Sequence, residues 1–170
     1  MSDSEFLLTY TPDYQRRIAR SPEDCFFGMY PTLGQVRARY GEEIAIAWLV
    51  PQLANLSEYC GARDKMTDMQ MEECAFNIVT EFHYLKVSEV MLFFHRVKAG
   101  KYGKIFFGTV DPLAVLDALR EFIQDRAFAI DRMEGAARMA AYDENRKGAV
   151  TYEEYRRLHP ENEPPISMMP

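Results

Sequence analysis

Cysteine and long hydrophobic runs are both scarce in this chain of 170 residues. The three cysteines, Cys25, Cys60 and Cys74, are an odd number and stand far apart, which excludes a disulfide scaffold and suits a reducing compartment. The longest apolar stretch, residues 44–51, has eight residues, whereas a membrane-spanning helix needs roughly 20. Because the start of the chain also lacks a basic stretch followed by an apolar run, we expect no secretory signal and predict a cytoplasmic protein without a membrane partner.

Basic residues are fewer than acidic residues: the chain has 20 Lys and Arg and 26 Asp and Glu, which give a formal net charge of -6 at pH 7. A protein this acidic does not coat nucleic acid with its whole surface, so any such binding must use a local basic patch. The contents of hydrophobic residues, 48%, and of charged residues, 27%, are typical of globular proteins and argue against wholesale disorder. The length is that of one ordinary domain, with or without a tail.

Motifs of common catalytic and metal sites are also missing. The cysteines and the three histidines show no C-x-x-C or H-x-x-x-H spacing, and there is no Walker A motif, no G-x-G-x-x-G after a strand and no G-x-S-x-G. We therefore predict a non-enzymatic protein with no catalytic residue, no metal ligand and no cofactor. A Cys–His catalytic pair assembled from distant segments is the alternative that would make it an enzyme.

Glycine and proline divide the chain into segments with helical patterns. We predict a mainly α fold: a single-domain helical bundle with one long C-terminal helix and at most one short strand or hairpin. Residues 1–31 form an irregular lead-in with one short helix near residues 14–20, and its aromatic side chains pack on the body. Residues 32–142 form the helical domain, residues 143–159 a turn and a short helix, and residues 160–170 a flexible Pro-rich tail.

Local signals place the individual helices. Capping boxes, in which a Thr oxygen and a Gln side chain satisfy each other's backbone amides, are expected at Thr32 with Gln35 and at Thr67 with Gln70. One helix follows Thr67, and the others span residues 33–40, 42–59, 88–99 and 112–142. Pro51 predicts a kink or a break near Leu49, because proline removes a backbone donor. The helix over residues 88–99 is apolar on more than one side, so we expect it at the centre of the fold.

The last and longest helix, residues 112–142, carries a seven-residue apolar repeat that is interrupted at Arg126. A helix of about 30 residues is about 45 Å long, which exceeds the core of a domain this size. Its second half, residues 131–142, therefore either projects or serves an interface. The members of the repeat are Leu116, Leu119, Ile123, Ile130, Met133, Ala137 and Ala140.

A basic and aromatic glycine-rich turn, around residues 95–104, is the candidate functional site. Four cations and no acidic residue occur between Arg96 and Val110, in a chain that is acidic elsewhere. Cations that hold phosphates or acidic side chains, together with rings that stack, are what single-strand binding uses. The six candidate residues are His95, Arg96, Lys98, Lys101, Tyr102 and Lys104, with His95 and Tyr102 as the stacking groups. The alternative is a helix end whose cations complement the helix dipole and whose aromatics are core. Residues 104–110 could form the one brief strand.

A second motif, residues 143–154, resembles a calcium loop of the EF-hand type at several positions. Lys147 departs from that pattern, because it stands where a side-chain oxygen is normally required. We favour the alternative, a glycine turn followed by Thr151 capping a short helix through Glu154.

Several short motifs stand in the same order along the chain: Met66-Thr67-x-x-Gln70, Tyr84-Leu85 with Glu89, Phe93-Phe94-x-Arg96-x-Lys98-x-Gly100-Lys101-Tyr102-Gly103, and Gly108-x-x-Asp111-Pro112. Together they resemble an uncharacterised family of small proteins that is associated with phages and mobile elements of gut bacteria. The similarity covers roughly residues 30–128 and implies no activity, so no residue role follows from it.

Two functional hypotheses follow. In the first, the protein is a non-enzymatic accessory protein of a phage or mobile element, and its basic turn binds single-stranded nucleic acid or an acidic, replication-type protein partner. In the second, it is a protein–protein adaptor or dimerisation module that forms a homo-oligomer through the helix over residues 112–142, without contacting nucleic acid.

Overall fold

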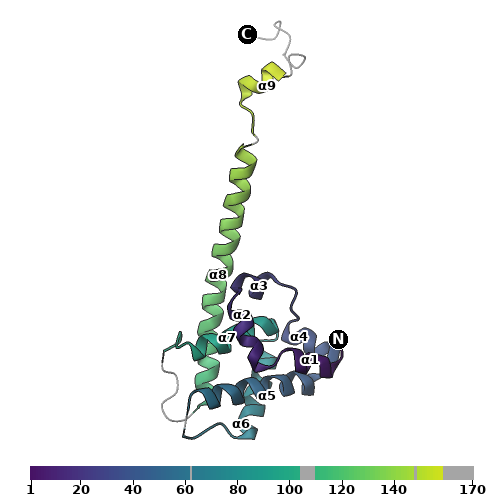
Figure 1. Ribbon diagram of the computed structural model, residues 1–170, viewed down its shortest axis with the longest axis vertical. Coiled ribbons are helices and arrows are strands. Elements are labelled where there is room, and N and C mark those ends of the chain that lie inside the picture. The colour runs from purple at the N-terminus through teal and green to yellow at the C-terminus, as the bar shows by residue number, and fades with distance from the viewer. Residues whose placement is uncertain (62, 104–109, 148, 159–170) are drawn as a thin grey trace. The chain divides into compact units, whose positions relative to one another are not determined.

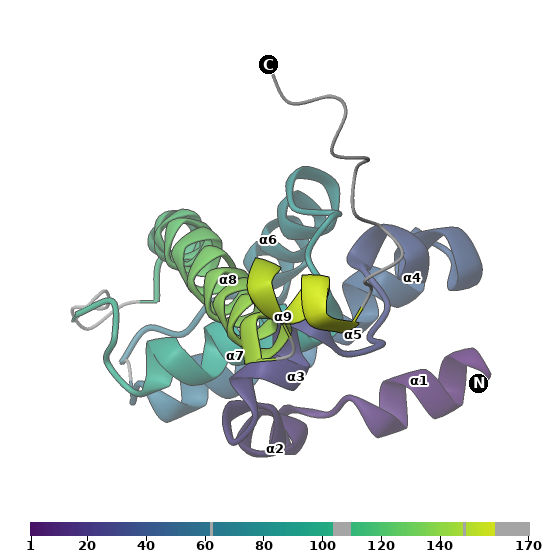
Figure 2. The same cartoon turned by 90° about the horizontal axis from the view of Figure 1, so that it is seen from above.

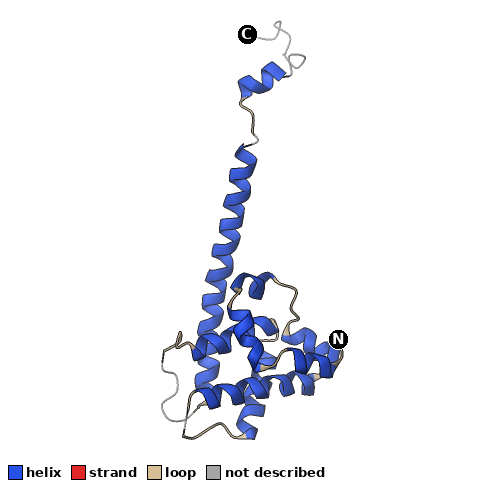
Figure 3. Ribbon diagram, viewed as in Figure 1, coloured by secondary structure: helices blue, strands red, loops and turns tan. Residues whose placement is uncertain are grey.

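The computed structural model describes residues 1–61, 63–103, 110–147 and 149–158. The regular elements in these segments are all helices, as Figure 1 and Figure 3 show, and one isolated bridge pairs Thr32 with Lys86. The predicted mainly α fold with a long C-terminal helix is confirmed for this part of the chain. In chain order the elements are α1 (Asp3–Thr9), the 3-10 helix η1 (Pro12–Tyr14), α2 (Gln15–Ala19), α3 (Pro22–Phe27), α4 (Leu33–Tyr40), α5 (Glu42–Tyr59), α6 (Asp68–Glu81), α7 (Val87–Lys98), α8 (Pro112–Lys147) and α9 (Tyr152–Leu158).

The chain divides into two compact units, Met1–Ile130 and Asp131–Pro170. The division falls inside α8, whereas the sequence suggested an end of the helical domain at residue 142. The lead-in belongs to the first unit. Across the described segments, no helix combines the length and the apolar character that a membrane span requires.

The lead-in is more helical than the sequence predicted, because it holds three short α-helices instead of one. Ser2 starts α1 in a capping box with Glu5, and Pro22 occupies the first turn of α3. Both features favour a helix start over irregular structure. Phe6 and Phe26 of these helices are buried in the first unit.

Helix α7 lies at the centre of the first unit. Every residue from Val87 to Phe94 is buried, the carboxylate-bearing Glu89 among them. Helices α2, α3 and α5 all contact α7 (Figure 2). The ring of Phe93 also packs edge-on against Phe122 of α8, with 5.7 Å between centroids. The expected central position of this helix is confirmed.

The predicted local signals form as expected. The amide of Gln35 donates to Thr32 Oγ1 at 3.1 Å, and the amide of Gln70 donates to Thr67 Oγ1 at 3.2 Å. Each Gln side chain also accepts from the Thr amide, which completes both capping boxes. Gly41, with a φ of 97°, ends α4 in a conformation that glycine adopts without steric cost.

Helix α5 runs without interruption through Pro51, so the predicted break near Leu49 is wrong. Proline lacks an N–H, and the carbonyl of Ala47 therefore loses its helical donor. That loss is limited to one hydrogen bond, whereas Trp48, Leu49 and Leu53 on both sides of the proline are buried. Tertiary packing of this kind supplies most of the stability of a helix and outweighs the missing bond.

A buried polar network joins the lead-in to α5. The carbonyl oxygen of Tyr10 accepts from Trp48 Nε1 at 2.8 Å and from Gln52 Nε2 at 3.1 Å. Gln52 Oε1 in turn accepts from Gln15 Nε2 at 2.6 Å, and both glutamine side chains are buried. Because buried amides must be hydrogen-bonded, this network fixes α2 against α5.

Helix α8 has 36 residues and is therefore about 54 Å long at 1.5 Å per residue. The Asp111 side chain accepts from the Leu113 amide at 2.9 Å, as expected of an N-cap. The helix continues to Lys147, so the turn predicted from residue 143 is wrong; basic residues in the last turn complement the helix dipole there. Its buried residues all lie in its first third: Val115, Leu116, Ala118, Leu119 and Phe122.

Two predicted features lie outside the described residues. Residues 104–109 include almost all of the brief strand expected over residues 104–110. Residues 159–170 include the Pro-rich tail.

Candidate functional site

The basic and aromatic turn begins in the last turns of α7 and continues past Gly100. Gly100 and Gly103 have φ values of 75° and 71°, in the left-handed region that favours glycine. Helix α7 ends at Lys98 with Ala99 as its C-cap, and Gly100 follows this cap and stops the helix, as the sequence predicted. Lys104, the sixth candidate residue, lies outside the described residues.

Lys98 is held inside the fold instead of pointing freely into solvent. Its Nζ donates to Gln15 Oε1 at 2.8 Å and also to Asn55 Oδ1, and it lies 5.9 Å from the centroid of the Tyr59 ring. Burial lowers the pKa of Lys98, and the positive charge of Arg16 lowers it further. Lys98 thus extends the polar network that ties the lead-in to the body.

Arg96 also turns inward. Its guanidinium carbon lies 5.5 Å from the centroid of the buried Phe122 ring on α8. One of its nitrogens, Nη1, is buried and has no hydrogen-bond partner within the described segments. A cation that covers a core aromatic ring in this way contributes packing as well as charge.

Tyr102 is buried, with 8% of its surface exposed, which corrects its expected role as a stacking platform. Its ring lies 6.2 Å from Phe93, and its hydroxyl donates to Asp125 Oδ2 at 3.4 Å. Burial raises the pKa of Tyr102 to about 12, with Arg96 acting in the opposite direction. Lys101 forms an ion pair with the same Asp125 carboxylate at 2.5 Å. The turn is therefore fastened to α8 by Tyr102 and by two of its cations, Arg96 and Lys101.

His95 is half-buried at the edge of a cavity of about 340 Å³. Burial lowers the pKa of His95, and the positive charges of Lys98 and Arg96 lower it further, so the neutral ring is favoured. The cavity is lined by residues of the lead-in, α5 and α7, namely Pro12, Asp13, Gln15, Arg16, Asn55, Tyr59, His95, Lys98 and Ala99.

The five described candidate residues do not share one surface. His95 and Lys98 line the cavity beside the lead-in, whereas Arg96, Lys101 and Tyr102 contact α8. In these five residues, the outward cluster of cations and rings that the sequence suggested is replaced by contacts within the fold.

The three cysteines are free thiols. Burial raises the pKa of Cys25 and of Cys74 to about 12, and it also raises the pKa of the half-buried Cys60. Protonated buried thiols are poor nucleophiles. Among the residues that the structure describes, no group of three or more His, Cys, Asp or Glu side chains could hold a metal ion.

The motif that resembles a calcium loop does not form a loop at its start. Asp143 and Asn145 lie within α8, and Gly148 lies outside the described residues. The Thr151 amide donates to Glu154 Oε2 at 2.9 Å, and the Glu154 amide donates to Thr151 Oγ1 at 3.3 Å. The favoured alternative, a capping box in front of a short helix, is confirmed.

The C-terminal unit, Asp131–Pro170, has no buried residue in its described part. Met133 and Gly135 are half-buried, and the remaining described residues of the unit are exposed. The apolar repeat of α8, of which Leu116 and Leu119 are buried in the first unit, continues into this one at Met133, Ala137 and Ala140. We call these three residues the α8 stripe.

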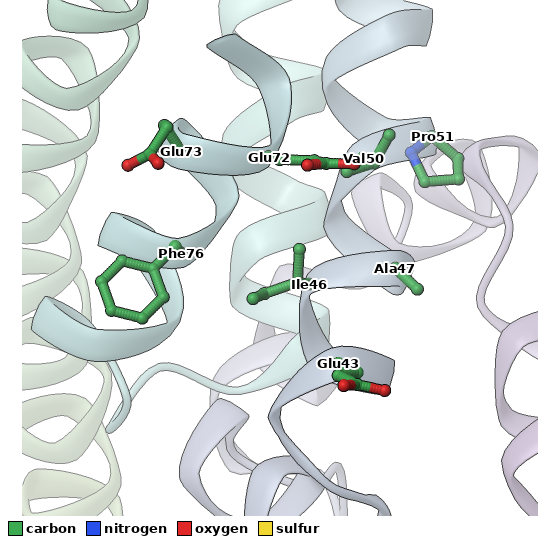
Figure 4. Close-up of a pocket in the computed structure, with 8 residues that line it drawn as sticks. All are labelled: Glu43, Ile46, Ala47, Val50, Pro51, Glu72, Glu73 and Phe76. Carbon is green, nitrogen blue, oxygen red and sulfur yellow. The ribbon is translucent and has the colours of Figure 1, made fainter. Parts of the chain in front are cut away.

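Sequence reasoning missed a groove between α5 and α6, with a volume of about 720 Å³ (Figure 4). We call it the α5–α6 groove. A Glu pair near the start of each helix and a proline in α5 were visible signals, but nothing in the sequence places the two helices side by side. The groove is lined by Glu43, Ile46, Ala47, Val50, Pro51, Glu72, Glu73 and Phe76.

A family of unknown function, DUF6633, matches residues 65–163, which is more than half of the chain and includes helices α6 to α9. No curated protein and no solved structure shows a significant match. The expected resemblance to an uncharacterised family is confirmed to that extent.

Proposed function

The chain belongs to the family of unknown function DUF6633, and we propose that it is a non-enzymatic adaptor that pairs with a second copy of itself through the α8 stripe. The observation that supports this most is the lack of a buried residue in the described part of the C-terminal unit. An isolated helix in water is marginally stable. Pairing with a partner helix supplies the packing that this segment lacks.

The residues of the stripe suit close helix pairing. Met133 offers a flexible apolar side chain, and Ala137 and Ala140 let a second helix approach to about 8 Å between axes. The spacing of three and four residues keeps all three on one face. Alanine also has the highest helix propensity, which keeps this segment helical before it pairs.

Charge favours a second copy as the occupant of the stripe. Residues 131–147 carry equal numbers of acidic and basic side chains, although the whole chain is acidic, so two copies can approach without net repulsion. Acidic and basic residues are interspersed along this segment, and an antiparallel pair opposes the two helix dipoles. The acidic residues are Asp131, Glu134, Asp143 and Glu144, and the basic residues are Arg132, Arg138, Arg146 and Lys147.

The setting of this adaptor is also part of the proposal. Three free thiols suit the cytoplasm, where disulfides are rare. The sequence resemblance implies a phage or mobile element as the source. Binding of nucleic acid through the basic turn stays a prediction, and it has less support than pairing because Tyr102 is buried and Lys101 is paired with Asp125.

Sedimentation velocity over a range of concentrations tests the proposal, with Met133→Glu as the variant. Each buried methionine contributes about 1.5 kcal/mol or more, and a dimer holds two, so we expect the dissociation constant to rise about a hundredfold or more. Met139→Glu is the matched control. Met139 lies on the same helix and is 61% exposed, and its side chain points about 120° around the helix axis from that of Met133. It should leave the dimer intact.

Three results would contradict the proposal. The first is a monomer at every concentration. Protection of the C-terminal unit from hydrogen exchange in such a monomer would indicate that the stripe docks within its own chain. The second is equal dissociation by both variants. The third is a dimer that only Met139→Glu dissociates, since the paired face would then be a different one.

A further inference from the structure

The α5–α6 groove lies in the first unit and is distinct from the α8 stripe. Figure 4 shows that its lining is distributed along both helices. Five of its eight residues are apolar, and Phe76 is the largest of them, with 40% of its surface exposed. This exposed phenyl ring and the half-buried Ile46 and Val50 form an apolar surface, which we call the floor of the groove. Contact of such a surface with water is unfavourable, so it favours an apolar partner.

Pro51 adds a hydrogen-bonding feature to the α5 side of the groove. Because proline has no N–H, the carbonyl of Ala47 has no donor from its own helix. Ala47 and Pro51 both line the groove, and both are exposed. The groove therefore offers a backbone acceptor that an incoming donor, such as a lysine ammonium, can use.

Three carboxylates surround the apolar floor: Glu43 on α5, and Glu72 and Glu73 on α6. All three side chains are exposed. No ion pair within the described residues engages any of them. The groove thus combines a floor for apolar side chains with a rim of one sign of charge.

We infer that the α5–α6 groove binds a basic amphipathic helix of a partner protein. The apolar face of that helix lies on Phe76, Ile46 and Val50, and its Lys and Arg side chains lie beside the three carboxylates. An amphipathic helix laid into a groove between two helices is a common mode of peptide recognition. The charge of the rim sets the sign of the partner and repels nucleic acid.

Fluorescence anisotropy with the full chain tests this inference. The probe is a labelled amphipathic peptide of about 18 leucine and lysine residues, long enough to form a helix. A counterpart peptide carries glutamate at every lysine position. We expect the lysine peptide to bind and the glutamate peptide to bind at least tenfold more weakly.

Two variants locate the binding site. Glu73→Lys should weaken the lysine peptide about tenfold, because it replaces attraction by repulsion at the rim. Phe76→Ser should weaken it by a similar factor through the floor, and an exposed residue can change without loss of the fold. Glu81→Lys is the matched control, because Glu81 is exposed on the same helix and is not part of the lining, and it should change binding less than threefold.

The inference is overturned if the lysine peptide fails to bind or if the glutamate peptide binds equally well. It is also overturned if Glu73→Lys and Glu81→Lys weaken binding equally, because net charge would then explain the effect. If Phe76→Ser abolishes self-association of the chain, the occupant is a second copy and the inference is wrong. None of these readouts depends on the α8 stripe, so failure here and failure of the proposed pairing are distinguishable.

Discussion

Replacing Arg126 with methionine should destabilise the first unit far more than its partial exposure suggests. Arg126 Nε lies 2.6 Å from Glu89 Oε1, and the Glu89 side chain is 0% exposed while that of Arg126 is 25% exposed. The second carboxylate oxygen of Glu89 accepts from the Lys86 amide at 2.8 Å. Without Arg126, a fully buried carboxylate keeps this backbone hydrogen bond but loses its ion-pair partner.

The expected cost is about 3–5 kcal/mol, which is typical when one partner of a buried ion pair is removed. Methionine retains much of the apolar stem of arginine, so lost packing contributes little. The double variant Glu89→Gln/Arg126→Met replaces the buried charge with a neutral amide. It should recover a large part of the loss, because leaving a charge unpaired costs more than removing both charges.

Arg120→Met is the matched control on the same helix. Arg120 Nη1 lies 2.6 Å from Asp117 Oδ1, the same distance as in the buried pair, but the two side chains are 60% and 74% exposed. Exposed ion pairs contribute about 0–1 kcal/mol, so this variant should be nearly neutral. The difference between the two Arg→Met variants therefore isolates the effect of burial.

Urea unfolding monitored by tryptophan fluorescence is the appropriate assay. Trp48 is the only tryptophan in the sequence and is 2% exposed in the first unit, so its signal reports the unfolding of that unit. A difference of at least about 2 kcal/mol between the two single variants is expected. Equal stability of the two single variants would refute the reasoning, as would a double variant whose loss equals the sum of its two single losses.

Three further outcomes are expected. A maleimide reagent at neutral pH should modify Cys60 first, and mass spectrometry should find Cys25 and Cys74 protected until urea unfolds the chain; early labelling of either would contradict their burial. The free energy of unfolding should fall as the pH rises above about 9. Unfolded thiols have an ordinary pKa of 9.0 and lose their protons there, whereas Cys25 and Cys74 have a folded pKa of about 12 and retain them. A double Cys→Ala variant should reduce this dependence on pH, and an unchanged dependence would assign it to other groups. Thr67→Ala should cost about 1 kcal/mol in urea unfolding through loss of the capping box, whereas a change near zero would mean that the cap is dispensable.

The parts of the fold that the sequence predicts well depend on short-range sequence signals. The boxes at Thr32 and Thr67 and the stop at Gly41 depend on residues within four positions of each other, and all three form. The central place of α7 was equally visible, because apolar residues on several sides require burial on several sides.

Long-range partners explain most of what the sequence missed. Arg126 interrupts the apolar repeat of α8, and only the approach of α7 shows that it pairs with the buried Glu89. Lys98 has a glutamine partner in the lead-in, 83 residues away along the chain. No spacing rule connects such pairs, so cations that hold the fold together resemble a binding patch when only the sequence is known.

A single sequence also does not predict whether a side chain in a turn points into the fold or into solvent. Tyr102 follows Gly100 in a segment rich in glycine and lysine, a pattern that favours an exposed platform. Phe93 and Asp125 come from α7 and α8, and the turn places Tyr102 against both of them. The composition of the turn therefore did not reveal that the ring of Tyr102 points into the fold.

Pairing through the α8 stripe and docking in the α5–α6 groove, if both occur, have a joint consequence that neither has alone. A dimer carries two grooves, so a partner with two basic helices joined by a flexible linker can engage both, and its apparent affinity should exceed that of a single helix by tenfold or more. Met133→Glu should abolish this gain for a tandem lysine peptide while leaving the affinity of the single peptide unchanged, because the groove lies in the other unit. A series of linker lengths separates the two effects, since the gain should vanish when the linker is too short to span the grooves. A tandem peptide that binds Met133→Glu as tightly as the unmodified chain, at every linker length, would show that the two surfaces do not act together.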